Sequence, residues 1–251
     1  HKELEPVLYQ LQKEDNYGLN LKDYSQFIKN NSINNAVIIN PNNPNGSYIN
    51  RSEIIEFLDE HTDLDSIILD ESFIHFAYEN SNMMLETLQS SIDKYKNLFI
   101  VKSMSKDFGI AGLRCGYVLM NDKNVSNFLN NGYLWNINGI AEYFFNLYGN
   151  EEFLLKYEDC RKKYITETLF FLNQLKELKN INVLPSKANF VLVELLNGLK
   201  SEDVSLNLLI NHGVYVRNCS DKVGLEGEYI RIAARSFDEN QQIFNALKEI
   251  K

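Results

Sequence analysis

The chain has 251 residues, of which 44% are hydrophobic and 24% charged, an ordinary globular mixture long enough for one large domain or two smaller ones. Its net charge of −9 argues against nucleic acid or an anionic membrane surface as a main partner, so any anion-binding site must be a local pocket. Three widely spaced cysteines and four scattered histidines predict neither a disulfide framework nor a metal site.

The first residues give no sign of targeting or membrane insertion. Residues 1–31 mix charged and aromatic side chains without an initiating methionine, and we expect a fragment, or a chain that lacks the first part of its domain. No apolar run approaches the roughly 18 residues needed to span a bilayer, and no signal peptide is recognisable. We therefore expect a cytoplasmic protein without a membrane or nucleic-acid partner.

The first clear strand, residues 36–39, leads into the loop Asn40-Pro-Asn-Asn-Pro-Asn-Gly46, where two prolines and a glycine exclude regular structure. Asn50 and Glu53 then form the capping-box pattern that begins a helix. The loop is either a plain strand-to-helix turn or a ligand site, because parallel sheets bind ligands at the carboxyl ends of their strands. An asparagine amide held there can donate to a ligand oxygen.

Two further strands end in polar residues. The second, 66–69, runs into Asp70, and a carboxylate at the end of a buried strand is costly unless a cation or hydrogen-bond donors meet it. The third, 98–101, leads into Ser103-Met-Ser-Lys106 and then to a strand at 114–120. A lone lysine in such a loop is most often a solvated surface residue, but it can also hold a Schiff base beside phosphate-binding hydroxyls. The alternation of strands and helices predicts a mostly parallel sheet.

The second half of the chain predicts a separate, smaller unit. Residues 139–178 contain only Gly149 as a breaker and predict one long helix or two. The remaining elements alternate, with strands at 189–195, 214–217 and 229–233 and helices at 201–212 and 237–250. We therefore expect a large domain at residues 1–152 and a small α+β domain at residues 153–251.

Three arginines of this unit, Arg217, Arg231 and Arg235, lie on or just beyond its strands. Strand arginines are usually paired or at an edge, yet three together in an acidic protein are equally consistent with an anion pocket. If the last strand persists far enough, Arg231 and Arg235 face the same side. Two converging guanidiniums repel one another unless a multiply charged anion lies between them, which predicts a substrate that bears a phosphate or phosphonate.

Four separated motifs, in this order, resemble those of the fold-type I pyridoxal-phosphate (PLP) enzymes, the class I and II aminotransferases. They are Asn40-Pro-Asn-Asn-Pro-Asn-Gly46, Asp70-Glu-Ser-Phe73, Ser103-Met-Ser-Lys106 with Gly112-Leu-Arg-Cys-Gly116, and Tyr229-Ile-Arg-Ile232. The resemblance implies an α/β fold with a three-layer α/β/α large domain, whose sheet is mostly parallel and whose N-terminal part is missing, and a small α+β C-terminal domain. It also implies pyridoxal 5'-phosphate as the cofactor and a homodimer with shared active sites.

The resemblance gives each matching residue a role. Lys106 and Asp70 are the catalytic residues, because Lys106 matches the Schiff-base lysine and Asp70 the partner of the pyridine nitrogen. The other matches are Asn43 for the phenolic oxygen of the cofactor, Ser103, Ser105 and Arg114 for its phosphate, and Arg231 for the substrate carboxylate. Arg217 and Arg235 are then left to bind a second anion of the substrate. Phe73 departs from the family, since many relatives have a tyrosine whose hydroxyl also reaches the phenolic oxygen.

Within the family, the chain resembles the histidinol-phosphate aminotransferases and the threonine-phosphate decarboxylases. We expect a transaminase that moves an amino group between a small phosphate- or phosphonate-bearing amine or amino acid and a 2-oxo acid. A PLP-dependent threonine-phosphate decarboxylase is the alternative, since the choice depends on which Cα bond lies perpendicular to the cofactor ring. A hypothesis of another class is the PLP-binding effector domain of a transcription regulator, which a helix-turn-helix ahead of the chain would indicate.

Overall fold

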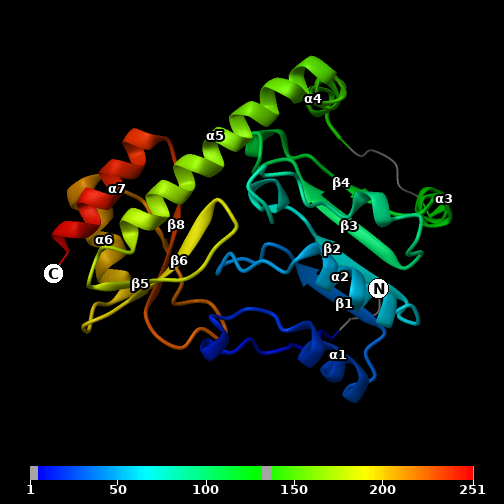
Figure 1. Ribbon diagram of the computed structural model, residues 1–251, viewed down its shortest axis with the longest axis horizontal. Coiled ribbons are helices and arrows are strands. Elements are labelled where there is room, and N and C mark those ends of the chain that lie inside the picture. Colours follow the sequence, from blue (N-terminus) through cyan, green and yellow to red (C-terminus); the bar gives the residue numbers. More distant parts are fainter. Residues whose placement is uncertain (1–4, 132–136, 251) are drawn as a thin grey trace.

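The computed structural model describes residues 5–131 and 137–250, which form a large and a small domain joined by one long helix (Figure 1). The sheet of the large domain contains β1 (Asn35–Ile39), β2 (Ser66–Asp70), β3 (Leu98–Ser103) and β4 (Gly116–Leu119), in that spatial order. The first three strands are parallel, whereas β4 pairs antiparallel with β3. The mostly parallel sheet that the sequence predicts is therefore confirmed.

One face of this sheet is covered by α1 (Leu21–Asn30) and α2 (Arg51–Glu60). Alternate strand residues point into this layer, so Ile38, Leu69 and Ile100 are buried against the helices. The capping box that the sequence predicts is present at the start of α2. By contrast, α1 is absent from the sequence prediction.

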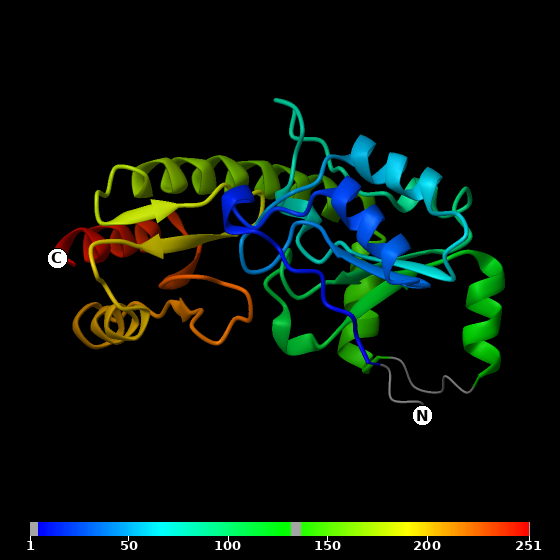
Figure 2. The same ribbon diagram turned by 90° about the horizontal axis from the view of Figure 1, so that it is seen from below.

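The opposite face of the sheet is only partly covered. In Figure 2, α3 (Asp122–Asn130) and α4 (Gly139–Tyr148) lie on the side away from α1 and α2. An open apolar cavity of about 720 Å³ remains between α3, α4 and the strands. Val37 and Val118 are 55% and 45% exposed on this face. The third layer of the expected α/β/α arrangement is therefore incomplete within the parts of the chain that the structure describes.

The long helix α5 (Glu151–Leu175) carries the chain from the large domain into the small one (Figure 1). Gly149 separates it from α4, so the helical stretch of the second half is two helices and not one. The proposed domain boundary between residues 152 and 153 falls in the first turn of α5. No helix in the described ranges, α5 included, is both long and apolar enough to cross a membrane.

The small domain is an antiparallel sheet with helices on one face. Its strands are β5 (Ile181–Val183), β6 (Phe190–Leu195), β7 (Arg217–Asn218) and β8 (Tyr229–Ala233), in the spatial order β5-β6-β8-β7. The end of α5 packs with α6 (Ser201–His212) and α7 (Phe237–Glu249) around a core that includes Phe171, Val193 and Ile232. This arrangement confirms the predicted α+β architecture of the C-terminal part.

Candidate active site

The candidate site lies where three parallel strands end. The chain leaves β1 for the loop that holds Asn43, leaves β2 at Asp70, and leaves β3 for the loop that holds Lys106. Because these strands are parallel neighbours, their carboxyl ends meet at one edge of the sheet, where α/β proteins bind ligands. The structure therefore brings together three motifs that are far apart in the sequence.

Asp70 is held at this edge by the turn that follows β2. Its Oδ1 atom accepts the backbone N–H of Ser72 at 2.8 Å, and the Ser72 hydroxyl accepts the backbone N–H of Ser103 at 3.2 Å. Ser72 thereby ties the end of β2 to the end of β3. The sequence gives little signal for this role, because the contact depends on which strand lies beside β2.

The loop after β3 begins with two serines. The Ser103 hydroxyl accepts the backbone N–H of Ser105 at 3.3 Å, and Ser105 is buried. Lys106 is exposed, and its Nζ atom lies 5.8 Å from the centroid of the Phe73 ring. The amine is therefore accessible from the strand edge while the start of the loop is packed into the domain.

Arg114 stands at the far end of this loop. Its φ of 54° places it in the left-handed region, and its guanidinium donates to the Ala111 carbonyl at 3.0 Å. Gly116 then pairs with Ser103 across the β3–β4 register. A Cβ atom on Gly116 would lie 2.5 Å from the Lys102 carbonyl oxygen, so the close approach of the two strands requires glycine. This approach brings the serine and arginine ends of the loop to the same edge.

Two phenylalanines connect the lysine loop to the small domain. The rings of Phe73 and Phe190 meet edge to face, with centroids 5.0 Å apart. The Lys106 ammonium lies 5.8 Å from the first ring, and the Arg231 guanidinium lies 4.9 Å from the second. Lys106 of the large domain and Arg231 on β8 of the small domain are therefore parts of one site. Phe190 has no signal in the sequence beyond its place at the start of a predicted strand.

Asn43 joins this group through Arg231. The Oδ1 atom of Asn43 accepts a hydrogen bond from Nη1 of Arg231 at 2.6 Å. With its oxygen engaged in this way, Asn43 presents its Nδ2 group as a donor for a ligand oxygen. The loop itself is rigid, because the buried Asn40 side chain accepts the N–H of Ile49 and donates to its carbonyl.

Arg217 is the cross-strand neighbour of Arg231. The two residues are directly opposite in the β7–β8 register, and Arg217 also forms an ion pair of 2.6 Å with Asp221. Burial, together with the like charge of Arg217, lowers the pKa of Arg231. Two of the three predicted arginines therefore lie side by side and concentrate positive charge at the site.

Arg235 lies in a different environment. The strand β8 ends at Ala233, so the expectation that Arg231 and Arg235 share one strand face is wrong. The Arg235 side chain is 59% exposed, and its guanidinium binds Glu239 at 2.9 Å across the first turn of α7. Arg235 lies just before the start of α7, where capping of the helix determines the backbone conformation. It therefore does not follow the alternation of side chains along β8.

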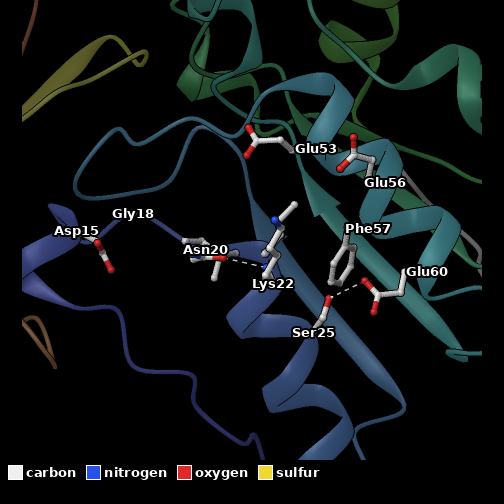
Figure 3. A pocket seen from close by; sticks show the side chains of 11 residues that line it. Asp15, Gly18, Asn20, Lys22, Ser25, Glu53, Glu56, Phe57 and Glu60 are labelled. Atoms are coloured by element: carbon white, nitrogen blue, oxygen red, sulfur yellow. Dashed lines mark hydrogen bonds between the residues drawn. The ribbon is translucent and has the colours of Figure 1, made fainter.

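A cleft of about 540 Å³ lies elsewhere on the large domain, between α1 and α2 (Figure 3). Four carboxylates line it, those of Asp15, Glu53, Glu56 and Glu60. Such a surface repels phosphate and carboxylate groups, and none of the predicted site residues borders it. The strand edge is therefore the better candidate for an active site that binds anions.

The sequence profile of the family described as "Aminotransferase class I and II" matches residues 1–248. The chain belongs to this family. It is 47% identical over 244 residues to an L-serine phosphate decarboxylase of Campylobacter jejuni, a match that covers 97% of this chain and 63% of that protein. It therefore spans a little under two thirds of the length of this curated relative.

Two solved structures share the fold over nearly the whole chain. A decarboxylase from Sulfurospirillum multivorans is 45% identical with a TM-score of 0.94, and the match covers 99% of this chain and 70% of that one. The histidinol-phosphate aminotransferase from Clostridium acetobutylicum is 29% identical with a TM-score of 0.83, and the match covers 96% and 70%. The expected α/β aminotransferase fold is therefore confirmed.

Enzymes of this family depend on PLP, and the donor set of the site fits that cofactor. The aldehyde of PLP needs an amine with which to form a covalent bond, and the exposed Lys106 presents one at the strand edge. A phosphate requires hydroxyl and guanidinium donors, and the same loop carries Ser103, Ser105 and Arg114. A carboxylate favours the protonated form of a pyridine nitrogen, and Asp70 lies on the adjacent strand.

Proposed function

We propose that the protein is a PLP-dependent decarboxylase that removes CO₂ from a small phosphorylated amino acid of the L-serine phosphate type. The observation that carries this proposal is the 47% identity to an L-serine phosphate decarboxylase, together with the TM-score of 0.94 to a solved decarboxylase. Transamination, the main expectation from the sequence motifs, is the weaker candidate, since the histidinol-phosphate aminotransferase of known structure is 29% identical. None of these three proteins is a transcription regulator.

In this proposal the side chains of the strand edge hold the cofactor. Lys106 would hold it covalently, Asp70 would pair with its ring nitrogen, and the Nδ2 group of Asn43 would donate to its phenolic oxygen. The loop side chains that bind its phosphate are Ser103, Ser105 and Arg114. Phe73 offers no hydroxyl, so it would add no hydrogen bond to the phenolic oxygen beside that of Asn43. When bound, PLP supplies an electron sink for the bond that breaks at the substrate Cα.

Arg231 and Arg217 form the proposed anion site for the substrate. As opposite residues on β8 and β7, they place two guanidiniums beside one another in a chain of net charge −9. Guanidinium pairs suit a phosphate dianion, because each can donate two hydrogen bonds to it. Arg235 remains a candidate third ligand that would have to leave Glu239.

Lys106 has a second role in this proposal. Once the substrate amine has taken its place on the cofactor, Lys106 in its ammonium form would be the group that donates a proton to the carbon that loses the carboxyl group. Its exposed amine, 5.8 Å from the centroid of the Phe73 ring, suits a group that must reach the substrate. We also propose a homodimer with shared active sites, as the family resemblance implies.

The test is to incubate the PLP-loaded protein with L-serine phosphate and to quantify CO₂ and ethanolamine phosphate together. Decarboxylation releases one CO₂ for each ethanolamine phosphate and needs no 2-oxo acid, whereas transamination forms a phosphorylated 2-oxo acid and consumes an added acceptor. Lys106→Ala should keep the circular dichroism of the wild type and lose both products. Formation of the oxo acid without CO₂ would establish transamination in place of decarboxylation.

A further inference from the structure

A lysine occupies a core position of β3 beside the loop that holds Lys106. Leu98, Ile100 and Lys102 alternate onto the same buried face of the strand, and Lys102 is only 2% exposed. Such alternation predicts a third apolar side chain at this position. A buried ammonium is costly unless a negative group meets it, so packing alone does not account for Lys102.

The negative partner is Asp107, the residue that follows Lys106. Its side chain is fully buried, and its Oδ2 atom forms an ion pair with Nζ of Lys102. The Nδ1 atom of His75 lies 3.5 Å from the same oxygen, and apart from these ion-pair contacts neither carboxylate oxygen has a hydrogen-bond partner in the described part of the chain. Burial raises the pKa of Asp107 to about 6 and lowers that of Lys102, so the pair is held in its charged form at a cost.

Stability does not explain this buried pair, because a buried ion pair can often be replaced by apolar residues without a loss of folding stability. The packing around Lys106 offers an explanation. Met104 and Ser105 are buried just before the lysine, and Asp107 is anchored to Lys102 just after it. Lys106 is therefore an exposed side chain between two fixed points, and the backbone that directs it has little freedom.

The same network reaches the helix that joins the domains. His75 hydrogen-bonds through Nδ1 to the Tyr157 hydroxyl of α5 at 2.7 Å. Burial keeps the pKa of His75 near 2, so this contact involves a neutral ring. Tyr157 also stacks on Phe108, with ring centroids 4.3 Å apart. The lysine loop is thus fixed against the helix that continues into the domain of Arg231.

We propose that Lys102 and Asp107 are positioning residues, which fix the loop so that the Lys106 amine stays over the Phe73 ring at the strand edge. The inference rests on the proposed function, in which Lys106 holds the cofactor. In this inference, the buried pair acts on the reaction of Lys106 with the cofactor without itself belonging to the residues that would bind the cofactor. A lysine misplaced by about 1 Å reacts markedly more slowly.

The test separates positioning from stability with a paired substitution. Lys102→Met and Asp107→Asn are made singly and together. Lys94→Met combined with Asp59→Asn serves as a matched control, because Lys94 and Asp59 form an exposed ion pair of 2.8 Å. Each protein is mixed with PLP, reduced with borohydride at timed intervals, and mapped by mass spectrometry for label on Lys106. Absorbance titration gives the Kd for PLP, and thermal melts report folding.

The double variant has no unpaired buried charge, so we expect its Tm to return toward the wild-type value. We expect its labelling of Lys106 to remain slowed by about tenfold or more, with a raised Kd for PLP, while the control pair behaves as wild type. Wild-type labelling in a folded double variant would overturn the inference and leave the proposed function intact. If the double variant does not fold, the same comparison is made with the folded single variant Asp107→Asn. Slowed labelling of Lys106 would then support the inference, and wild-type labelling would overturn it. Wild-type protein without label on Lys106 would overturn the proposed function itself.

Discussion

At the scale of single residues, Asp70 gives the most direct test of the cofactor site. One of its carboxylate oxygens already accepts the Ser72 N–H, and Asp70→Asn keeps an acceptor there while it removes the charge. We expect the variant to fold normally and to turn over about 100- to 1,000-fold more slowly, because a neutral amide cannot keep the ring nitrogen protonated. Steady-state assays and circular dichroism check this, and undiminished turnover would make Asp70 a structural residue.

The two environments of the arginines lead to a second prediction. Arg231→Ala should lower kcat/KM for a phosphorylated substrate about 10- to 100-fold, because hydrogen bonds between charged groups contribute roughly 1.5–3 kcal/mol. Arg235→Ala should lower it less than about threefold, since the exposed guanidinium already binds Glu239 and an exposed pair contributes little. Measuring kcat/KM of both variants with phosphorylated and unphosphorylated analogues shows which arginine binds the phosphate. A loss confined to the phosphorylated substrate in Arg235→Ala would restore its expected role as a phosphate ligand.

Sequence motifs are informative at this scale only where the chemistry is local. Asn43, Asp70 and Lys106 are predicted as site residues because each stands at or beyond the end of a strand within a recognisable motif, and the structure places all three at one edge. Ser72 and Phe190 are not found, because their importance comes from neighbours on other strands. Contacts of this kind leave no spacing pattern in the chain.

At the scale of elements, periodicity predicts the strands well and their ends less well. The strand predicted at 114–120 begins at Gly116, because Arg114 adopts a left-handed backbone. The strand predicted at 214–217 overlaps the observed β7 only at Arg217, since Arg217 and Asn218 are the residues that pair with β8. The helix α1 is missed although Asn20 caps it and turn-type residues stand on both sides, Gly18 before it and Asn31 and Ser32 after it. Boundaries thus depend on partners that the sequence does not specify.

The cap of α6 gives a prediction at this scale. No side chain within the helix start caps it, and the Glu228 carboxylate instead accepts the backbone N–H and the hydroxyl of Ser201, both at 2.8 Å. These hydrogen bonds, the backbone one foremost, lower the pKa of Glu228 from 4.5 to about 2. Because the folded-state pKa is depressed, the stabilisation is present above pH 4.5 and is lost as the pH falls toward 2.

We therefore expect Glu228→Gln to lower the free energy of unfolding at pH 7 by about 1 kcal/mol, the usual contribution of a helix cap. Its difference from wild type should shrink as the pH falls from 4.5 to 2. Urea unfolding at several pH values measures this, with exposed Glu177→Gln as the control. A difference that stays constant over this range would show that the charge of Glu228 does not cap α6.

At the scale of the whole molecule, the N-terminal segment and a buried arginine of α5 join the domains in addition to the contacts of Phe190 and Arg231 at the site. The N-terminal segment lies against the small domain, where Lys13 pairs with Glu194 at 2.6 Å and Tyr17 packs edge to face on Tyr229. The carbonyl of Tyr17 also accepts the Asn45 amide of the large domain at 2.6 Å. This segment thus touches both domains beside the asparagine loop, and its contacts across about 200 residues are beyond any local pattern.

The buried arginine is Arg161 on α5, whose side chain is 1% exposed. Its Nη1 donates to the His75 carbonyl at 2.9 Å, its Nη2 to the Met83 carbonyl, and its Nε to Glu158 at 2.7 Å. A single buried guanidinium therefore satisfies two carbonyls of the large domain from the interdomain helix. Removing it leaves buried acceptors without donors, and a buried unsatisfied group costs about 1–3 kcal/mol.

Arg161→Met keeps most of the side-chain volume and isolates this effect. We expect it to lower the free energy of unfolding by about 2–4 kcal/mol, whereas Lys163→Met, at a position 79% exposed on the same helix, should change it by less than about 0.5 kcal/mol. Because Arg161 fastens α5 to the large domain, its loss should also separate the unfolding of the two domains in a urea titration followed by circular dichroism and tyrosine fluorescence. Coincident curves with an unchanged midpoint would mean that the helix is held by its aromatic contacts, such as that of Tyr157 with Phe108, and not by the guanidinium.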